Sequence, residues 1–360
     1  MRKILICGYI GFNNFGDEAL LHILIRDLIN TGFNRNNITV VTNNPADTKS
    51  TYSINACNRW NPFEILASII NNEAIIFIGG AFQDKTSFRS FLYYFFILIA
   101  AKILGKEIIF YGAGVGPFER RISSSLFSIG VNEVRLATVR DQESQAYFPP
   151  QVPVITSCDP VWTIEPDYNI QKDIKDINWQ QPIMGISLKL DKYLKPAHIK
   201  NIAEKVTKML IGMKDWQVLL IPLMPNEDLP VLYELQDFIS SKIQDIERVK
   251  LLEHTENYSI ESLTGILGSC DVVVGMRYHS LIVSLSCGKP VFGLIFDHKV
   301  KTLIDSTGQV GVIWREDMEQ PWNYFWQNIE GSTEKAKLAT EKAKKLHQRN
   351  IELLNKLLTA

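Results

Sequence analysis

One short segment, Gly275-Met276-Arg277-Tyr278-His279-Ser280, carries side chains that suit the binding of an anion. It follows an apolar run and opens a helical pattern at Tyr278–Ser286, so Arg277 and His279 lie beside unpartnered backbone N–H groups. The guanidinium of Arg277 offers a planar fork to a carboxylate or phosphate. His279 is suited to donate to a phosphate or to move a proton near neutral pH, although a lone histidine is more often structural. The segment predicts a phosphate-binding site.

Two lysines are expected to add positive charge to this site. Lys189 ends the apolar run Ile183–Leu188, and Lys299 follows the run Pro290–Leu294. If both runs are strands of one parallel sheet, both lysines lie at its carboxyl edge, where ligands bind in such sheets. A solvated surface lysine is the competing interpretation of Lys299. A small donor with a carboxylate and a phosphate would satisfy this group of cations.

Three glycine-rich loops follow apolar runs in the first half of the chain: Gly8–Glu18, Gly79–Asp84 and Gly112–Pro117. Glycine lets backbone N–H groups turn toward a ligand without a clash of Cβ, and a helix that begins near Asp17 offers its positive end. A helix cap at Asp17 and ordinary turns elsewhere are the competing interpretations. The candidate binding residues of the first two loops are Gly11, Asn14, Gly16, Asp17, Gly80, Gln83 and Asp84.

The loops differ from the common nucleotide and metal motifs. The first loop does not have the GxGxxG spacing, and no acidic residue clearly marks a ribose site. The chain also has no P-loop, HExxH or GxSxG motif. The sequence therefore favours neither a dinucleotide enzyme nor a metalloprotease, serine hydrolase or kinase, and we expect no metal and no cofactor.

Short apolar runs alternate with helical patterns in both halves of the chain. Runs that are apolar throughout are typical of strands buried on both faces of a parallel sheet. We expect an α/β fold with two Rossmann-like doubly wound domains, residues 1–165 and 180–330, and a C-terminal helix at 332–358. The expected strands are Lys3–Cys7, Ile38–Thr42, Ala74–Ile78, Glu107–Tyr111, Leu136–Val139, Ile183–Leu188, Gln217–Pro222, Val249–Leu252, Asp271–Gly275 and Pro290–Leu294.

Composition argues against several partners. The 360 residues include 38 Lys plus Arg and 39 Asp plus Glu, so the formal net charge is −1. A nearly neutral chain lacks the field expected of a nucleic-acid-binding protein. The five cysteines form no CxxC pair, which indicates reduced thiols rather than a disulfide framework or a zinc site. With no signal peptide evident, we expect a cytoplasmic protein.

Two segments bear on membrane contact. The run Phe91–Ala101 is wholly apolar but too short to span a bilayer as a helix, which needs about 20 residues. We expect a buried helix there, with peripheral contact to the inner face of a membrane as the alternative. The lysines of the segment 332–358 are expected to form a solvated face, with contact to a membrane surface as the alternative.

Six motifs follow one another along the chain in the order seen in a known protein family. They are GYIGFNNFGDEAL, GGAFQD, GAGVGP, VRDQES, CDPV and GMRYHS. Over residues 1–330 the chain resembles the polysaccharide pyruvyl transferases, and most of all the bacterial branch that acts on secondary cell-wall polymers. The resemblance implies a GT-B-like arrangement of two Rossmann-like domains, with the acceptor on the first and the donor on the second. It also implies that pyruvate from phosphoenolpyruvate is placed on a sugar, free or lipid-linked, as a ketal while phosphate is released.

The resemblance also assigns roles to residues. The family's Arg-Leu-His signature, which contacts the donor, falls on Arg277, Tyr278 and His279, with tyrosine in place of leucine. A second donor-binding arginine falls on Lys189, which keeps the charge but loses the bidentate fork. His279 would bind phosphate or donate a proton.

The sugar hydroxyl must lose a proton to a base. On the resemblance, Asp17 or, as a weaker candidate, Asp84 would take that proton. No metal is implied.

Two other functions stay open at this stage. A GT-B glycosyltransferase with a nucleotide-sugar donor would share the fold and the anion site, but no acidic residue near Arg277 is well placed to hold a ribose. A non-catalytic anion- or sugar-binding relative is favoured by the lysine at position 189. The sequence makes no prediction of the acceptor sugar or of the oligomeric state.

Overall fold

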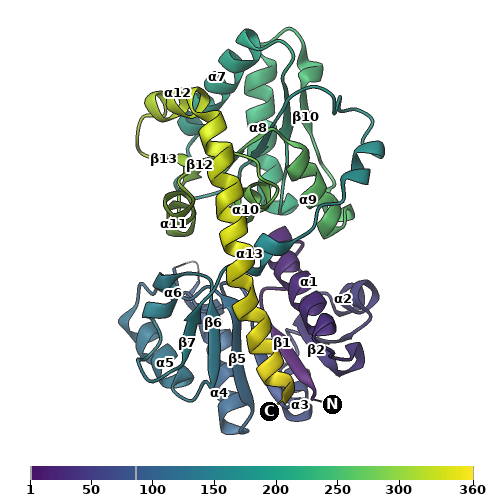
Figure 1. Cartoon of the computed structure of the whole chain (residues 1–360), viewed down its shortest axis with the longest axis vertical. Helices are drawn as coiled ribbons and strands as arrows, with labels where there is room; N and C mark the ends of the chain where they lie inside the picture. The colour runs from purple at the N-terminus through teal and green to yellow at the C-terminus, as the bar shows by residue number, and fades with distance from the viewer. Residues whose placement is uncertain (1, 86, 360) are drawn as a thin grey trace. The chain divides into compact units, whose positions relative to one another are not determined.

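The computed structural model describes residues 2–85 and 87–359. The chain forms two compact units, each built on one parallel sheet with interleaved helices (Figure 1). Unit 1 comprises Met1–Thr163 and Ala343–Ala360, and unit 2 comprises Ile164–Lys342. The expected class, α/β with two Rossmann-like doubly wound domains, is confirmed.

Unit 1 has a seven-stranded parallel sheet in the order β3-β2-β1-β4-β5-β6-β7. The order reverses direction at β1, which pairs with β2 on one side and β4 on the other, so that Ile4 lies opposite both Ile38 and Ala74. The strands are β1 (Ile4–Cys7), β2 (Ile38–Thr42), β3 (Asn55–Asn58), β4 (Ala74–Phe77), β5 (Glu107–Ala113), β6 (Leu136–Val139) and β7 (Val154–Thr156).

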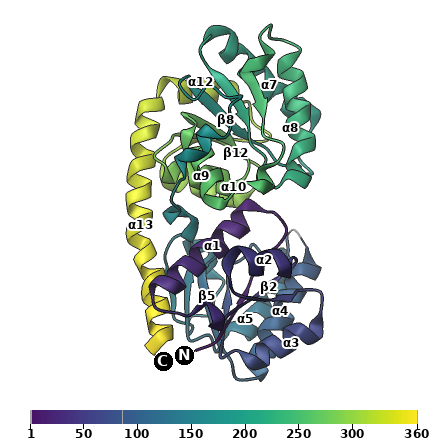
Figure 2. The same ribbon diagram turned by 90° about the vertical axis from the view of Figure 1, so that its right-hand side faces the viewer.

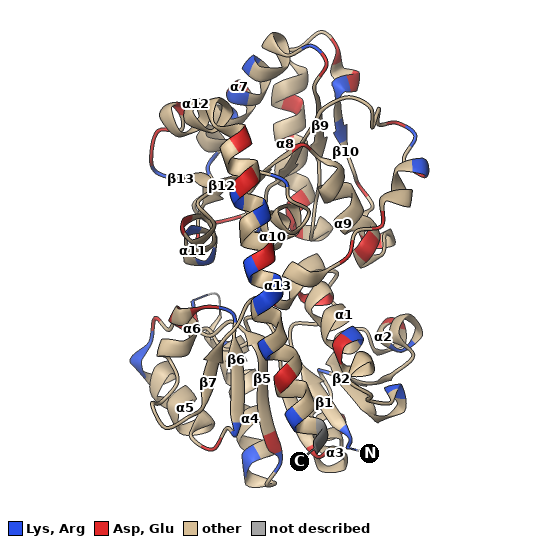
Figure 3. Ribbon diagram, viewed as in Figure 1, with Lys and Arg blue, Asp and Glu red and all other residues tan. Residues whose placement is uncertain are grey.

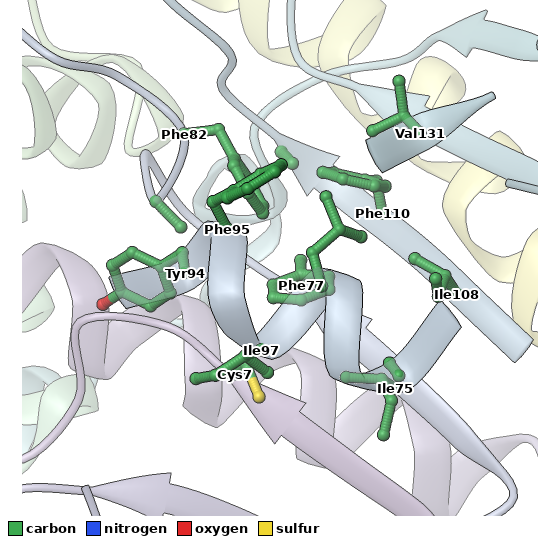
Figure 4. Packing of buried hydrophobic residues seen from close by; sticks show 14 of the residues in the cluster. Cys7, Ile75, Phe77, Phe82, Tyr94, Phe95, Ile97, Ile108, Phe110 and Val131 are labelled. Atoms are coloured by element: carbon green, nitrogen blue, oxygen red, sulfur yellow. The ribbon is translucent and has the colours of Figure 1, made fainter. Parts of the chain in front are cut away.

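Helices cover both faces of this sheet. Figure 2 shows α3, α4 and α5 on the side of the sheet opposite α1. The helices are α1 (Phe15–Asn30), α2 (Pro45–Tyr52), α3 (Pro62–Asn71), α4 (Phe88–Ile103), α5 (Arg121–Val131) and α6 (Gln142–Ala146), with short 3-10 turns η1 (Arg35–Asn37) and η2 (Pro160–Thr163). The core beneath α4 is rich in aromatic rings, among them Phe77, Phe82 and Phe110 (Figure 4).

The apolar run Phe91–Ala101 lies within α4 and packs into this core. Several of its buried residues, Phe91, Tyr94, Leu98 and Ala101, lie three or four positions apart, as one face of a helix requires, and Phe95 and Ile97 are buried beside them. The expected buried helix is therefore present. Within the described part of the chain, no helix is both long and apolar enough to cross a membrane.

Unit 2 has a six-stranded parallel sheet in the order β10-β9-β8-β11-β12-β13. Its strands are β8 (Ile183–Ser187), β9 (Gln217–Leu220), β10 (Val249–Leu251), β11 (Val272–Gly275), β12 (Val291–Ile295) and β13 (Val310–Ile313). Its helices are α7 (Pro196–Gly212), α8 (Pro225–Ser240), α9 (Ile260–Ser269), α10 (Tyr278–Ser286), α11 (His298–Thr307) and α12 (Glu319–Gln327), with 3-10 turns η3 (Tyr168–Lys172), η4 (Ile246–Arg248) and η5 (Thr255–Asn257).

The last helix, α13 (Ile329–Thr359), contributes residues to both units, which divide between Lys342 and Ala343. Its buried residues form a narrow stripe at helical spacing, which includes Ala336, Thr340 and His347. Both acidic and basic residues lie along the rest of it (Figure 3). Its exposed lysines are Lys335, Lys337, Lys342, Lys344, Lys345 and Lys356.

Candidate functional site

The predicted donor residues of unit 2 gather at the carboxyl edge of its sheet. Strands β8, β11 and β12 are neighbours and run parallel. Lys189, Arg277 and Lys299 follow these three strands in that order. The structure therefore brings to one edge side chains that are far apart in the sequence.

Arg277 is the N-cap residue of α10, and its largely buried side chain is held by two carboxylates. Its Nε donates to Asp228 Oδ2 at 2.7 Å and to Oδ1 at 2.9 Å, while Nη2 donates to Glu227 Oε2 at 3.1 Å. Within the described residues, Nη1 makes no such bond. The guanidinium is thus fixed along one edge, and one terminal nitrogen is left for a ligand.

Asp228 is fully buried and makes further bonds at the start of α8. Its Oδ2 accepts from the backbone N–H groups of Leu223 and Met224, at 2.9 and 3.0 Å. Burial raises the pKa of Asp228, although Arg277 and these N–H groups lower it in part. Burial would lower the pKa of Arg277, but Asp228 and Glu227 outweigh it, and the pKa is raised. Arg277 therefore stays charged.

His279 and Tyr278 lie in the first turn of α10, as predicted. Both are half-buried, and their rings meet edge to face with centroids 5.1 Å apart. The α10 N-terminus is tightened by Ser280, whose hydroxyl donates to the Arg277 carbonyl at 2.6 Å. Arg277, Tyr278 and His279 thus occupy one helix start, a position that favours anions.

Lys189 and Lys299 share a carboxylate, that of Asp297. Lys189 Nζ lies 3.1 Å from Asp297 Oδ2, and Asp297 Oδ1 accepts from the Val300 N–H at the start of α11. Burial would raise the pKa of Asp297, but Lys189, Lys299 and the Val300 bond outweigh it, and the pKa is lowered. This ionised carboxylate offsets part of the positive charge of the two lysines.

In unit 1, the first glycine-rich loop folds over the ends of β1 and β2. Gly11 has a φ of 82°, and a Cβ there would lie 2.4 Å from Thr42 Oγ1 and 2.6 Å from the Asn44 nitrogen. Asn14 then caps α1, because its Oδ1 accepts from the Gly16 N–H at 3.3 Å. Glycine at position 11 is therefore required by both backbone conformation and space.

Glu18 is a titratable group at the end of the first loop to which the sequence analysis assigned no role. Its Oε1 accepts from the Gly11 N–H at 2.7 Å, so the carboxylate folds back onto the loop. Burial, with smaller contributions from Asp17 and Asp47, raises the pKa of Glu18 to about 7, against hydrogen bonds from Gly11 and Phe12. Glu18 thus changes charge near neutral pH.

The first loop and the second loop are neighbours, since β1 and β4 pair and Cys7 lies opposite Phe77. Asp17 accepts from Asn14 Nδ2 at 2.6 Å, and its Oδ1 lies 3.0 Å from where a Cβ of Gly79 would be. Gly80 and Gln83, also predicted for this region, are half-buried residues of the second loop.

Asp84 ties the second loop to the start of α5. Its carboxylate accepts from the Glu119 N–H at 2.6 Å, the Arg120 N–H at 3.0 Å and the Ser123 hydroxyl at 2.6 Å. Burial would raise the pKa of Asp84, but these bonds outweigh it and the pKa is lowered. Because both carboxylate oxygens of Asp84 accept hydrogen bonds, the side chain is suited to holding the second loop in place.

The third loop brings in two motifs to which the sequence analysis gave no role. Gly114 donates to the Gly79 carbonyl at 3.0 Å, and a Cβ at Gly114 would lie 2.5 Å from Cζ of Arg140. Arg140 is buried between Asp141, with Nε 3.2 Å from Oδ2, and Asp159, with Nη1 3.7 Å from Oδ2. The VRD and CDP segments therefore meet beneath this loop.

Comparison with solved structures places the fold in the GT-B class. UDP-GlcNAc 2-epimerase from Neisseria meningitidis, solved with UDP-GlcNAc, matches with a TM-score of 0.66 at 15% identity over 98% of this chain and 100% of that one. Anabaena Alr3699/HepE with UDP-glucose gives 0.60 at 14% identity, covering 100% and 98%. A glycosyltransferase from Rickettsia africae gives 0.62 at 10% identity, covering 99% and 98%. At these identities the likeness concerns the fold.

The sequence itself defines the family. The pattern of the polysaccharide pyruvyl transferases matches residues 14–298, and the chain belongs to that family. No curated protein matches the chain. The resemblance inferred from the motifs is therefore confirmed.

Proposed function

We propose that the protein transfers pyruvate from phosphoenolpyruvate to a sugar of a cell-surface polysaccharide or its precursor, forms a ketal and releases phosphate. The observation that most supports this is the state of Arg277. It is charged, fixed by Asp228 at a helix start, and has one nitrogen without a partner among the described residues. This arrangement suits an oxyanion-rich donor.

On the donor side, Arg277 and Lys189 hold the carboxylate and the phosphate of phosphoenolpyruvate. Lys299 adds charge at the same sheet edge, and Tyr278 and His279 line the start of α10. His279 binds the phosphate or donates a proton. Because a lysine lacks the bidentate fork of an arginine, the contribution of Lys189 is weaker than that of Arg277.

On the acceptor side, we assign Glu18 as the base. Its pKa of about 7 suits a group that must be ionised at neutral pH yet accept a proton. Asp17, the base expected from the sequence, lies beside it and raises the pKa of Glu18. We assign Asp84 to holding the loop, because its oxygens are engaged by two N–H groups and one hydroxyl.

The proposed reaction joins the pyruvyl carbon to two hydroxyls of one sugar and releases phosphate. A proton, from His279 in this scheme, adds to the methylene carbon of phosphoenolpyruvate and makes the neighbouring carbon electrophilic. A sugar hydroxyl forms a C–O bond to that carbon and loses its proton to Glu18. The C–O bond to phosphate then breaks, and a second hydroxyl of the sugar closes the ketal and passes its proton to the departing phosphate.

We place this reaction in the cytoplasm, because all five cysteines are free and four of them are buried. Such thiols are typical of a reducing compartment. Contact with the inner face of a membrane belongs to the same proposal if the acceptor is lipid-linked.

A second candidate function is transfer from a nucleotide sugar. Structures of the same fold are named as bound to UDP-GlcNAc and to UDP-glucose. The cationic side chains of Lys189, Arg277 and Lys299 in unit 2 would also suit the binding of a diphosphate.

Calorimetric titration separates these candidates. The purified chain and its Arg277→Ala variant are titrated with phosphoenolpyruvate and with a panel of UDP-sugars. Binding of phosphoenolpyruvate that is lost in the variant supports pyruvyl transfer, whereas binding of a UDP-sugar instead would overturn it. Donor binding without phosphate release, across a panel of sugar acceptors, would identify a non-catalytic relative.

A further inference from the structure

Arg59 is a buried cation that the proposed reaction does not use. It directly follows β3, at the carboxyl edge of the unit 1 sheet, and only 6% of it is exposed. Its guanidinium carbon lies 4.8 to 5.8 Å from the centroids of five aromatic rings. We call Arg59 and the five residues that carry these rings the Arg59 cluster: Tyr9, Phe12, Trp60, Tyr93 and Tyr94.

The charge of Arg59 has no counter-charge within residues 2–85 and 87–359. No carboxylate of that part of the chain forms an ion pair with it, and its Nε and Nη1 are buried without a hydrogen-bond acceptor. Two other buried arginines differ: Arg277 pairs with Asp228, and Arg140 pairs with Asp141 and Asp159. Arg59 thus has the surroundings of a guanidinium whose anionic partner comes from outside the chain.

Aromatic rings stabilise a cation but do not replace acceptors for its N–H groups. Ring faces attract the guanidinium electrostatically, yet each buried N–H without an acceptor keeps its desolvation penalty. An apolar side chain would fill this space without that penalty. The arginine is therefore better explained by recognition of an anion than by packing.

The rings of the cluster are held in place by hydrogen bonds around them. Trp60 is 67% exposed, and its indole N–H donates to Asn43 Oδ1 at 2.7 Å. The Tyr93 hydroxyl donates to the Arg59 carbonyl at 3.2 Å. Tyr94 is a core residue, but its hydroxyl points away from Phe77 and Phe110 (Figure 4). Hydrogen bonds thus fix two of the rings, and one of these two, Trp60, is largely exposed.

Two of the rings stack face to face beside the charge, so the pair presents one outer ring face on each side. Tyr9 and Phe12 are half-buried and stack at 4.1 Å with an angle of 6° between their planes. Flat aromatic surfaces with a few fixed polar groups are the usual lining of small-molecule sites, and the C–H face of a sugar ring suits them.

The Arg59 cluster is directly connected to Glu18. Phe12, whose ring centroid is 4.8 Å from the guanidinium carbon, also hydrogen-bonds Glu18 through its backbone N–H. Its neighbour Gly11 donates to Glu18 at 2.7 Å. A ligand held by Arg59 would therefore lie next to the loop that carries the proposed base.

We infer that Arg59 selects an acidic acceptor: it binds an oxyanion of the saccharide while the sugar ring lies against the aromatic surface. The oxyanion is a carboxylate on the sugar or a phosphate on its anomeric carbon. This inference rests on the proposed function and makes Arg59 a specificity-determining residue.

The test is a binding titration with three soluble probes: a methyl glucuronide, glucose 1-phosphate and methyl glucoside, each with the full chain. We expect an acidic probe to bind at least tenfold more tightly than the neutral one, and the better of the two acidic probes identifies the anion. Equal binding of all three probes by the wild-type chain would overturn the inference.

Single-residue variants then test whether Arg59 causes the preference for acidic probes over the neutral one. Arg59→Gln should lose the tenfold preference, and Arg59→Lys should retain part of it, because it keeps the charge. Arg135→Gln, at a 68% exposed arginine of the same unit, should behave as wild type. A folded Arg59→Gln variant that keeps the full preference would contradict the inference.

A parallel titration with phosphoenolpyruvate separates this inference from the proposed function. Phosphoenolpyruvate binding should be unchanged in Arg59→Gln and lost in Arg277→Ala. If the wild-type chain binds acidic sugars but not phosphoenolpyruvate, the proposed donor is wrong while the role of Arg59 in anion binding stands.

Discussion

Asp228 and Arg277 lie 49 positions apart in the chain, yet Asp228 accepts both hydrogen bonds of the Arg277 Nε, at 2.7 and 2.9 Å. The carboxylate is fully buried and also accepts from two backbone N–H groups. Asp228 therefore acts as a positioning residue that fixes the guanidinium at the start of α10.

Asp228→Asn should weaken phosphoenolpyruvate binding, because the guanidinium loses its fixed orientation. A hydrogen bond to a charged group contributes about 1.5–3 kcal/mol, so we expect a loss of roughly 10- to 100-fold in affinity. Calorimetric titration gives the affinity, and a thermal melt shows whether the variant is folded. Glu227→Gln is the matched control: Glu227 also bonds Arg277 but is half exposed, so its effect should be within about fivefold. Equal losses in the two variants would contradict the positioning role.

Glu18 should set the acid limb of the pH–rate profile. Its pKa is raised to about 7, and the base must be ionised to accept a proton. We expect kcat/KM to rise about tenfold per pH unit below pH 7 and to level off above it. Glu18→Gln should reduce the rate by about 10²–10⁴-fold and remove this limb. Steady-state phosphate release between pH 5 and 9 measures both effects.

Asp17→Asn is the control for that profile. Asp17 raises the pKa of Glu18, so its neutralisation should move the acid limb to lower pH while leaving a limb in place. If Asp17→Asn abolishes the limb and Glu18→Gln leaves it unchanged, Asp17 is the base, as the sequence alone suggested.

The stability of the chain should depend on pH through the same group. The pKa of Glu18 is higher in the folded chain, about 7, than its ordinary value of 4.5. The folded state therefore binds the proton more tightly, so the free energy of unfolding should fall as pH rises from about 4.5 to 7. Denaturant unfolding of the wild type and of Glu18→Gln at pH 5 and pH 8 tests this. The wild type should lose more stability than the variant between these two values, and parallel losses would argue against the raised pKa.

The sequence predicted the parts of this structure that depend on local pattern. The buried runs at Ala74–Phe77 and Val272–Gly275 are apolar throughout, and the helix at Tyr278–Ser286 follows directly from its motif. The edge strand Asn55–Asn58 was missed because its sequence, NACN, is mostly polar, which an edge position tolerates. The helix α13 was predicted, but its division between two units depends on packing that no local pattern records.

The site residues that escaped prediction owe their roles to distant partners. Asp228 has a role because its carboxylate accepts hydrogen bonds from Arg277. Glu18 has a role because its carboxylate accepts a hydrogen bond from the Gly11 N–H, where the loop turns back. Arg59 is a single basic residue in sequence, while its rings come from three segments of unit 1: the first loop, Trp60 next to Arg59, and α4. Periodicity and motif spacing carry no information on such contacts.

Gly11→Ala should disturb the acceptor loop in two ways. The residue has a φ of 82°, and a Cβ would lie 2.4 Å from Thr42 Oγ1. Positive φ in a non-glycine residue costs about 1–3 kcal/mol, and the clash adds to it. We expect a lower free energy of unfolding and a rate at least tenfold lower at fixed acceptor concentration. Gly32→Ala is the matched control, because Gly32 has a φ of 98° with no atom near its Cβ position. The control should lose stability from the backbone strain but keep its rate.

His347 on α13 should anchor the end of that helix to α1. Its Nε2 lies 2.7 Å from Oδ2 of Asp27, a buried carboxylate that also bonds the Tyr111 hydroxyl and Arg26. Breaking a buried pair by removing one partner costs about 3–5 kcal/mol, so His347→Ala should lower the free energy of unfolding by about that amount.

The pH dependence of this anchor follows from Asp27. Burial would raise the pKa of Asp27, but His347, Arg26 and Tyr111 outweigh it, and the pKa is lowered from its ordinary 3.8. The stabilisation is therefore present above that ordinary value and is lost as pH falls through the lowered pKa. Denaturant unfolding at pH 7 should show a clear difference between wild type and His347→Ala, and acid unfolding should show that the difference shrinks below about pH 4. Lys344→Ala, at an exposed position of the same helix, should match the wild type at both pH values; a loss in Lys344→Ala as large as in His347→Ala would mean that helix propensity, rather than the buried pair, holds the end of α13.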